Sequence, residues 1–374
     1  MVPVRLRLPL LALGGLALVT GMWLGLVRLG WGLYGPGLPP SLPAMHGALM
    51  VGSFFGTLIG LERAVALGRR WAYLAPLLSG LSGVALLVGL PREVGAVLLS
   101  LSSLMLVAIY AVVLRMQFAL FTVTMALGAV AWLGGNLLWL SGRPVYGLVY
   151  WWAGFLVLTI AGERLELSRV LRLGSRARAA FAGAMALFGV GLLLSTFAAD
   201  AGARVAGLGL LALSLWLGLN DVARRTVRQK GLTRFIAVSL LLGYVWLGVG
   251  GVLAAVFGEL SAGPRYDAVL HCLFLGFVFS MVFAHAPIIL PAVTGAAVPY
   301  RPLFYAHLAL LHASLVVRVA GDLTGWADGR QWGGMANVAA VVLFVASTAW
   351  AVATARRAKS EGRSRRYDSL PGTP

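Results

Sequence analysis

Five histidines are the side chains of this chain best suited to bind a metal or to carry a proton. Neutral imidazole is a frequent ligand of transition metals, and it also ligates haem iron. No histidine lies between residues 47 and 270, so one stands alone near the start and four fall in the last third of the chain. The five positions are His46, His271, His285, His307 and His312.

His46 and His271 are expected at the same depth in two different helices. Each lies four residues into an apolar run that crosses the membrane in the same direction, so each imidazole lies about 6 Å below the same surface. Two imidazoles at one depth are what a haem iron needs for bis-histidine ligation, and we predict that this pair binds haem b. The alternative is that both are interfacial side chains that form hydrogen bonds with neighbouring carbonyl groups.

A second group of ionisable side chains is expected near the opposite membrane surface. His285 follows His271 by fourteen residues, close to four helical turns, so it lies about 21 Å further along nearly the same face. Together with His307, Glu62 and Glu163 it could form a carboxylate–imidazole metal site for non-haem iron, zinc or copper. In the alternative, Glu62 and Glu163 form ion pairs with nearby arginines.

Two arginines are candidates to bind the propionates of a haem. Arg318 and Arg330 are expected near the same surface as the first histidine pair, and guanidinium groups bind carboxylates bidentately. Arg318 could instead form an i,i+4 ion pair with Asp322. His312 lies in the middle of an apolar run, and the sequence assigns it no role.

The composition requires a bilayer around these side chains. Of the 374 residues, 60% are hydrophobic and 11% are charged, whereas a soluble domain has about 25% charged residues. Mean hydropathy is +0.90. These values exclude a soluble enzyme and a disordered chain, and the single cysteine, Cys272, excludes an intramolecular disulfide. We predict an all-α polytopic membrane protein in contact with the lipid bilayer.

Twelve apolar runs are long enough to cross a hydrocarbon core of about 30 Å as helices. We expect them to form one transmembrane domain over residues 1–356, followed by a basic, disordered tail over 357–374. The first run is too long for a cleaved signal peptide and is expected to remain as a span. The runs cover roughly residues 8–33, 42–61, 71–90, 94–114, 118–140, 145–162, 179–198, 202–220, 235–258, 267–291, 302–320 and 332–355.

The basic residues predict the topology. Of the 30 lysines and arginines, 23 fall in the N-terminus, the even-numbered connections and the tail, and only six fall in the odd-numbered connections. Positively charged loops stay in the cytoplasm, so we expect a multi-pass protein of the cytoplasmic membrane with both termini inside. The net charge of +18 is then a topology signal, and we expect no nucleic-acid partner.

The second, sixth and tenth runs share a faint pattern. In each, a glycine comes just before a phenylalanine, and an ionisable residue follows that phenylalanine by eight positions. A real repeat would give three pseudo-symmetric four-helix units. The alternative is chance similarity between helices with the same packing needs. The three segments are Gly52–Glu62, Gly154–Glu163 and Gly276–His285.

The histidine-bearing segments resemble those of two families. Twelve spans with histidines on the second and tenth resemble subunit I of the haem–copper oxidases. The segments are more closely similar to the NnrS family, twelve-span haem-containing membrane proteins linked to nitric oxide stress and denitrification. Glycine follows His46 where NnrS proteins tend to have glutamate, and Pro291–Gly295 replaces their Gly-His-Thr-Gly turn. The similar segments are Met45–Phe55, Leu270–Gly276 and Tyr305–Arg318.

The resemblance implies a function as well as a cofactor. By it, His46 and His271 are haem ligands, and the protein acts in nitric oxide or redox handling, by electron transfer or sensing, with nitric oxide or a redox protein as partner. Oxygen reduction is excluded, because five histidines cannot supply the six that copper and two haems need in an oxidase.

Two other functions stay open. One is a proton-coupled secondary transporter that uses Glu62, Glu163 and His285. The other is an assembly subunit without a cofactor. The sequence does not determine the oligomeric state.

Overall fold

The computed structural model describes residues 2–33, 35 and 39–368, and within these ranges the backbone forms helices and no β-strand. Long apolar segments form helices in a bilayer because every backbone donor and acceptor is then satisfied inside the segment. The prediction of an all-α polytopic membrane protein is confirmed.

Each of the twelve predicted runs coincides with a helix. Short helices η1 (Leu42–Met45), η4 (Val145–Gly147), η5 (Ser168–Leu171) and α9 (Ala223–Thr226) lie in the connections. The twelve matching helices are α1 (Val4–Arg28), η2 with α2 (Ala48–Leu67), η3 with α3 (Arg70–Leu87), α4 (Arg92–Met116), α5 (Leu120–Leu140), α6 (Val149–Leu167), α7 (Ser175–Ser195), α8 (Ala199–Asn220), α10 (Gly231–Phe257), α11 with η6 and α12 (Pro264–Thr294), α13 (Phe304–Thr324) and α14 (Ala327–Asp368).

Eleven of these helices are long and apolar enough to cross a membrane, counted over the described residues. The twelfth is α6, which has 19 residues but carries Glu163, Arg164 and Glu166 in its last turns. Fourteen of its residues are buried in the protein. Two of the three charged side chains at its end form ion pairs with other elements of the bundle: Arg164 with Asp221, and Glu163 with Arg63.

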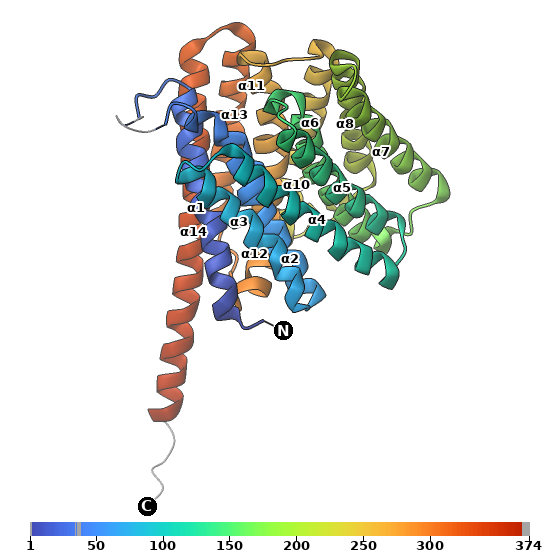
Figure 1. The fold of residues 1–374 in the computed structure, drawn as a ribbon. Helices are drawn as coiled ribbons and strands as arrows, with labels where there is room; N and C mark the ends of the chain where they lie inside the picture. Colours follow the sequence, from blue (N-terminus) through green and yellow to red (C-terminus); the bar gives the residue numbers. More distant parts are fainter. Residues whose placement is uncertain (1, 34, 36–38, 369–374) are drawn as a thin grey trace, which may run out of the picture.

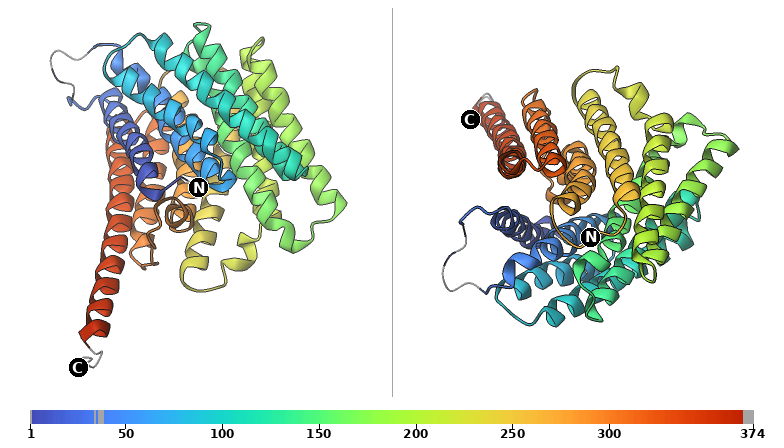
Figure 2. Two further views of the ribbon diagram at one scale, coloured as in Figure 1. Left: turned by 60° about the horizontal axis from the view of Figure 1, so that its bottom comes forward. Right: turned by 90° about the horizontal axis from the view of Figure 1, so that it is seen from above.

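The second, sixth and tenth spans are the most buried helices of the bundle. About two thirds of Ala48–Leu67 and of Pro264–Thr294 are buried, against 28–56% for the other candidate spans, and α6 is buried to a similar degree. The three spans that share the sequence pattern therefore share a central position. The other helices pack around them, mostly beside their neighbours in the chain, for example α3 beside α4, α7 beside α8, and α13 beside α14 (Figures 1 and 2).

The second and tenth spans each contain an eight-residue π-helix. These are η2 (Ala48–Phe55) and η6 (Cys272–Phe279). In a π-helix the hydrogen bond joins residues i and i+5, so each turn holds one more residue than in an α-helix. Such segments are rare and are often found at functional sites. Here each one begins directly after a histidine of the predicted pair: η2 begins two residues after His46, and η6 begins one residue after His271.

Both ends of the described chain lie at the same end of the bundle, where α1 begins and α14 ends (Figure 1). The last helix runs to Asp368, so helical backbone continues past residue 356, where we expected a disordered tail to begin. Alanine, arginine, lysine and glutamate dominate this stretch, and these residues have high helix propensity. Residues 369–374 of the predicted tail lie outside the described residues.

Candidate functional site

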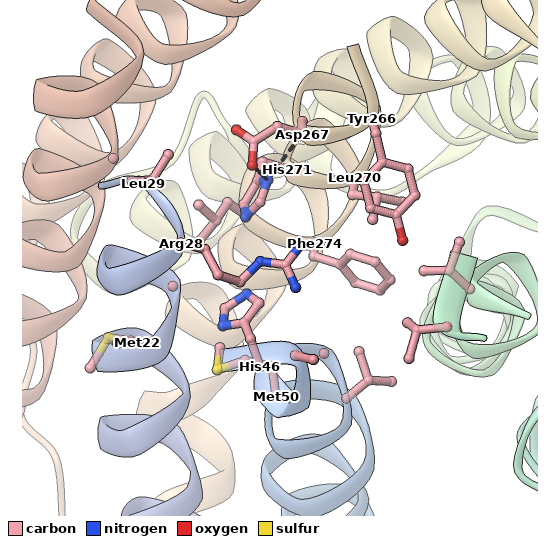
Figure 3. Close-up of a pocket in the computed structure, with 18 of the residues that line it drawn as sticks. Met22, Arg28, Leu29, His46, Met50, Tyr266, Asp267, Leu270, His271 and Phe274 are labelled. Carbon is pink, nitrogen blue, oxygen red and sulfur yellow. Dashed lines mark hydrogen bonds and ion pairs between the residues drawn. The ribbon is translucent and has the colours of Figure 1, made fainter. Parts of the chain in front are cut away.

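The structure brings the predicted outer histidines together. His46, between η1 and η2, and His271, at the end of α11 (Pro264–His271), have ring centroids 6.4 Å apart and ring planes inclined by 25°. The two imidazoles extend toward each other from opposite helices (Figure 3). They lie at the end of the bundle opposite both ends of the described chain, and the two helices bring the predicted pair into proximity.

Hydrogen bonds orient both rings in the same way. The Nδ1 atom of His46 lies 2.7 Å from the carbonyl oxygen of Gly21 in α1, and the Nδ1 atom of His271 lies 2.8 Å from that of Asp267. A carbonyl oxygen only accepts, so Nδ1 carries the proton in each ring, and the Nε2 lone pair is left free. Metal-binding histidines have this arrangement, in which the second ring nitrogen donates to a carbonyl or carboxylate. The expected carbonyl bonds are thus present, and they are compatible with metal ligation.

A cavity of about 570 Å³ surrounds the two imidazoles. Its volume lies within the range of about 300–1,000 Å³ that is usual for cofactor and ligand pockets. Most of the wall is apolar and aromatic, with Phe55, Trp139, Trp152, Phe274 and Phe279 among its members. An amphipathic aromatic molecule could pack its rings against this apolar wall.

Four arginines and one carboxylate supply the charge of this cavity. The arginines are Arg28, Arg92, Arg318 and Arg330, and the acid is Asp267. The excess of positive charge suits an anionic ligand, since guanidinium groups bind carboxylates in a planar, bidentate manner.

One of our interpretations of the sequence paired Arg318 with Asp322. The structure gives Arg318 a different partner. Its guanidinium binds both oxygens of Asp267 at 2.8 Å each, and Asp267 also lies 3.2 Å from the Nδ1 atom of His271. Asp322 faces Arg330 at 2.9 Å instead. Residues 318 and 322 are neighbours on one helix, but Asp267 of α11 accepts two hydrogen bonds from Arg318, whereas Asp322 has an ion-pair contact with Arg330 without a hydrogen bond.

Both predicted propionate-binding arginines line the cavity, and each already contacts a carboxylate. Arg92 contacts its neighbour Glu93 at 3.0 Å. Arg28, in the last turn of α1, is the exception: within the described part of the chain its guanidinium has neither an ion pair nor a hydrogen bond. Its side chain reaches toward the space beside the two imidazoles (Figure 3). In the sequence, Arg28 stood out only as one of the six basic residues of the odd-numbered connections.

The geometry can be tested against the cofactor that the resemblance implies. Imidazole nitrogens bind metals at about 2.0–2.1 Å, so two rings on opposite sides of one iron have centroids roughly 6 Å apart. The observed 6.4 Å, the free Nε2 atoms and the apolar, arginine-rimmed cavity all fit a haem. His46 and His271 would hold its iron.

The predicted inner metal site does not assemble. Glu62 and Glu163 are held close to one another by Arg63, which pairs with both carboxylates. The Nδ1–H of His285 donates to the carbonyl of Met281 in its own helix at 2.8 Å. Among the residues that the structure describes, no three histidine, cysteine, aspartate or glutamate side chains are grouped so that they could hold a metal ion. The geometry therefore favours our alternative, ion pairing with arginine.

His307 lies apart from that group in an aromatic box. It is 1% exposed, and its Nδ1 atom is 3.3 Å from the Oγ atom of Ser347. Among the residues that the structure describes, no carboxylate is grouped with it that could help to hold a metal ion. The ring centroids of the four surrounding phenylalanines are 4.7–6.0 Å away, and these are Phe235, Phe283, Phe304 and Phe344.

His312 joins three helices. The indole Nε1–H of Trp246 in α10 donates to its Nδ1 atom at 2.9 Å, and Ser280 of α12 lies 3.5 Å from its Nε2 atom. Its Nδ1 atom is therefore the unprotonated one, the reverse of His46 and His271, and both of its nitrogens face protein groups. His312 therefore links helices of the bundle and does not line the cavity.

A buried ion pair was missed by the sequence reasoning. Arg164 of α6 binds both oxygens of Asp221 at 2.8 Å, and the hydroxyl of Tyr244 donates to the same carboxylate at 3.0 Å. Asp221 also accepts from the backbone N–H of Ala223 at 2.6 Å. The carboxylate lay in a basic connection, and nothing in the sequence indicated that it turns into the bundle.

The sequence model of one family, described as a domain of unknown function (DUF8744), matches residues 7–353. The match spans nearly the whole chain, and the chain belongs to this family. Among curated proteins none matches it.

Proposed function

We propose that this member of the DUF8744 family is a haem-binding membrane protein that holds haem b between His46 and His271. The observation that carries the proposal is the pair of imidazoles with centroids 6.4 Å apart, each oriented by an Nδ1–carbonyl hydrogen bond, in the wall of a cavity of about 570 Å³. Interfacial histidines that only satisfied nearby carbonyls would have no reason to face each other across a cavity.

The chain's own residues would give the site three properties. The two Nδ1–H···O=C bonds fix the ring tautomers and leave the Nε2 atoms as ligands. The aromatic wall excludes water and keeps the surroundings of low polarity. The arginines at the rim, Arg28 first among them, compensate the charge of the propionates.

A bis-histidine haem accepts and gives up single electrons, and its potential depends on the groups around its ligands. With this cofactor the protein would transfer electrons or sense the redox state of its surroundings. The resemblance of Met45–Phe55 and Leu270–Gly276 to NnrS supports nitric oxide or redox handling in the cytoplasmic membrane, with both termini inside. The paired state of Glu62 and Glu163 gives the transporter alternative no comparable support.

Absorbance spectroscopy of detergent-purified protein, expressed with an ample haem supply, tests the proposal. We expect a sharp α band after reduction with dithionite and about one haem per chain in the pyridine haemochromogen assay. The α band should be lost in the double variant His46→Ala/His271→Ala and retained in His312→Ala, a matched control whose side chain lies outside the cavity. Wild-type protein that stays colourless would overturn the proposal.

A further inference from the structure

We infer that the two histidines are unequal ligands: His271 is the permanent one, and His46 is the exchangeable one, which leaves when a small uncharged diatomic molecule binds on its side of the cavity. This inference rests on the proposed function. The ligand-binding position is the one that His46 occupies, and movement of His46 opens it.

His271 is held by groups of its own helix and by a buried charge pair. Its Nδ1 atom lies 2.8 Å from the carbonyl oxygen of Asp267 and 3.2 Å from the carboxylate of the same residue, one helical turn earlier. That carboxylate is clamped in turn by two 2.8 Å bonds from Arg318, whose side chain is 7% exposed. The ring, the carboxylate and the guanidinium thus form one connected unit between α11 and α13. Hydrogen bonds to charged groups are the stronger kind.

His46 has a single anchor, and that anchor belongs to another helix. Within the described part of the chain, its ring has one hydrogen bond, to the carbonyl oxygen of Gly21 in α1, 25 residues earlier, and no carboxylate supports it. A π-helix follows both histidines, but the backbone before them differs: His46 follows the 3₁₀ segment Leu42–Met45, whereas His271 ends the regular α-helix α11. A small shift of α1 against the second span would break the bond to Gly21 without disturbing His271.

The imidazole of His46 also packs closely against α1. Gly25 of α1 faces the imidazole, and a Cβ atom on it would lie 3.1 Å from Cε1 of the ring. The cavity wall on this side continues with Met22, Met45 and Met50, whose side chains are unbranched and adaptable. A small, uncharged ligand such as carbon monoxide or nitric oxide suits a dry, thioether-lined wall of this kind, whereas a charged one would lose its hydration there.

Single variants test the inequality by haem content and carbon monoxide binding. We expect His46→Ala protein to keep most of its haem, held by His271, and to bind carbon monoxide at least about tenfold more tightly than wild type, since the competing ligand is gone. His271→Ala protein should lose most of its haem. Equal loss in both variants, or the reverse order, would overturn the inference. Haem in the wild-type protein reports on the proposed function separately, so failure of the two can be told apart.

A milder variant keeps both histidines in place. Gly25→Ala should press on the imidazole of His46 and raise the fraction of high-spin haem and the carbon monoxide affinity, by about tenfold if the Gly21 bond is lost. Gly15→Ala is the matched control, because Gly15 lies on the same helix with nothing within 4 Å of the added Cβ. If both variants retained the low-spin spectrum and the affinity of the wild type, His46 would not be the weakly held ligand.

Discussion

At the scale of single residues, Arg28 stands out in the cavity because no carboxylate among the described residues neutralises it. A charged hydrogen bond to a propionate contributes about 1.5–3 kcal/mol. We therefore expect Arg28→Gln to weaken haem binding by about tenfold to a hundredfold, measured by titrating haem into apoprotein. Arg318→Gln is a different experiment, because it would also free the buried carboxylate of Asp267.

The control for this variant is Arg265→Gln. Arg265 is an exposed arginine in the first turn of α11, at the same end of the bundle, and its guanidinium lies over the ring of Phe257, 4.9 Å from the centroid. It tests whether any loss of positive charge near the surface weakens binding. Haem affinity that falls equally in both variants would show that Arg28 acts through the general field and not as a direct partner.

Some contacts of these residues can be predicted from the sequence, and others cannot. The approach of His46 to His271 could be predicted, because equal depth follows from counting residues along two helices. The partners of Arg318 could not be predicted, because they depend on how α11 and α13 are rotated against each other. The i,i+4 spacing along one helix favours Asp322 as the partner of Arg318. In the fold, Arg318 instead donates two hydrogen bonds to Asp267.

At the scale of elements, the pair Arg164–Asp221 connects α6 to the connection after α8, and Tyr244 adds α10. The side chains are 4% and 0% exposed. Removing one partner of a buried ion pair costs about 3–5 kcal/mol, because the other charge is left without compensation. We expect Asp221→Ala to lower the thermal unfolding midpoint in detergent strongly, and the double variant Arg164→Met/Asp221→Leu to recover part of the loss.

Asp200→Ala is the control that shows whether burial of the ion pair matters. Asp200 also forms a bidentate pair, with Arg204, but this pair lies at the surface. Exposed pairs contribute little to stability, so the unfolding midpoint of Asp200→Ala should stay close to that of the wild type. Equal effects of the two aspartate variants would contradict a special role for the buried pair.

The π-helices are the feature of the elements that sequence reasoning could not have found. All twelve runs were found from apolar length, since a membrane span needs about 20 such residues. The amino-acid sequences of Ala48–Phe55 and Cys272–Phe279 do not distinguish a π-helix from an α-helix, because either type of helix would bury the same apolar side chains. The choice is made by tertiary contacts, such as the close approach of Gly52 to Leu99 and of Gly276 to Trp246.

At the scale of the whole molecule, the two ends of the bundle differ in character. One end holds the histidine pair and the cavity, and the other holds both ends of the described chain and the ion pairs of Arg63 and Arg164. The connections at the cavity end are the odd-numbered ones, which carry six basic residues against 23 elsewhere. By the positive-inside rule we expect the cavity end to face away from the cytoplasm, and a redox partner or a diffusible ligand would then reach the cavity from outside.

Cysteine labelling can test this orientation directly, because the chain has a single cysteine, Cys272, which is fully buried. In a Cys272→Ala background, Ser141→Cys and Gln117→Cys place one thiol at each end of α5, both at exposed positions. We expect a membrane-impermeant maleimide to label position 141 in intact cells and position 117 only after lysis, because loops rich in basic residues stay in the cytoplasm. The reverse pattern would turn the cavity toward the cytoplasm, and its electron donor or ligand would then have to be sought among cytoplasmic molecules.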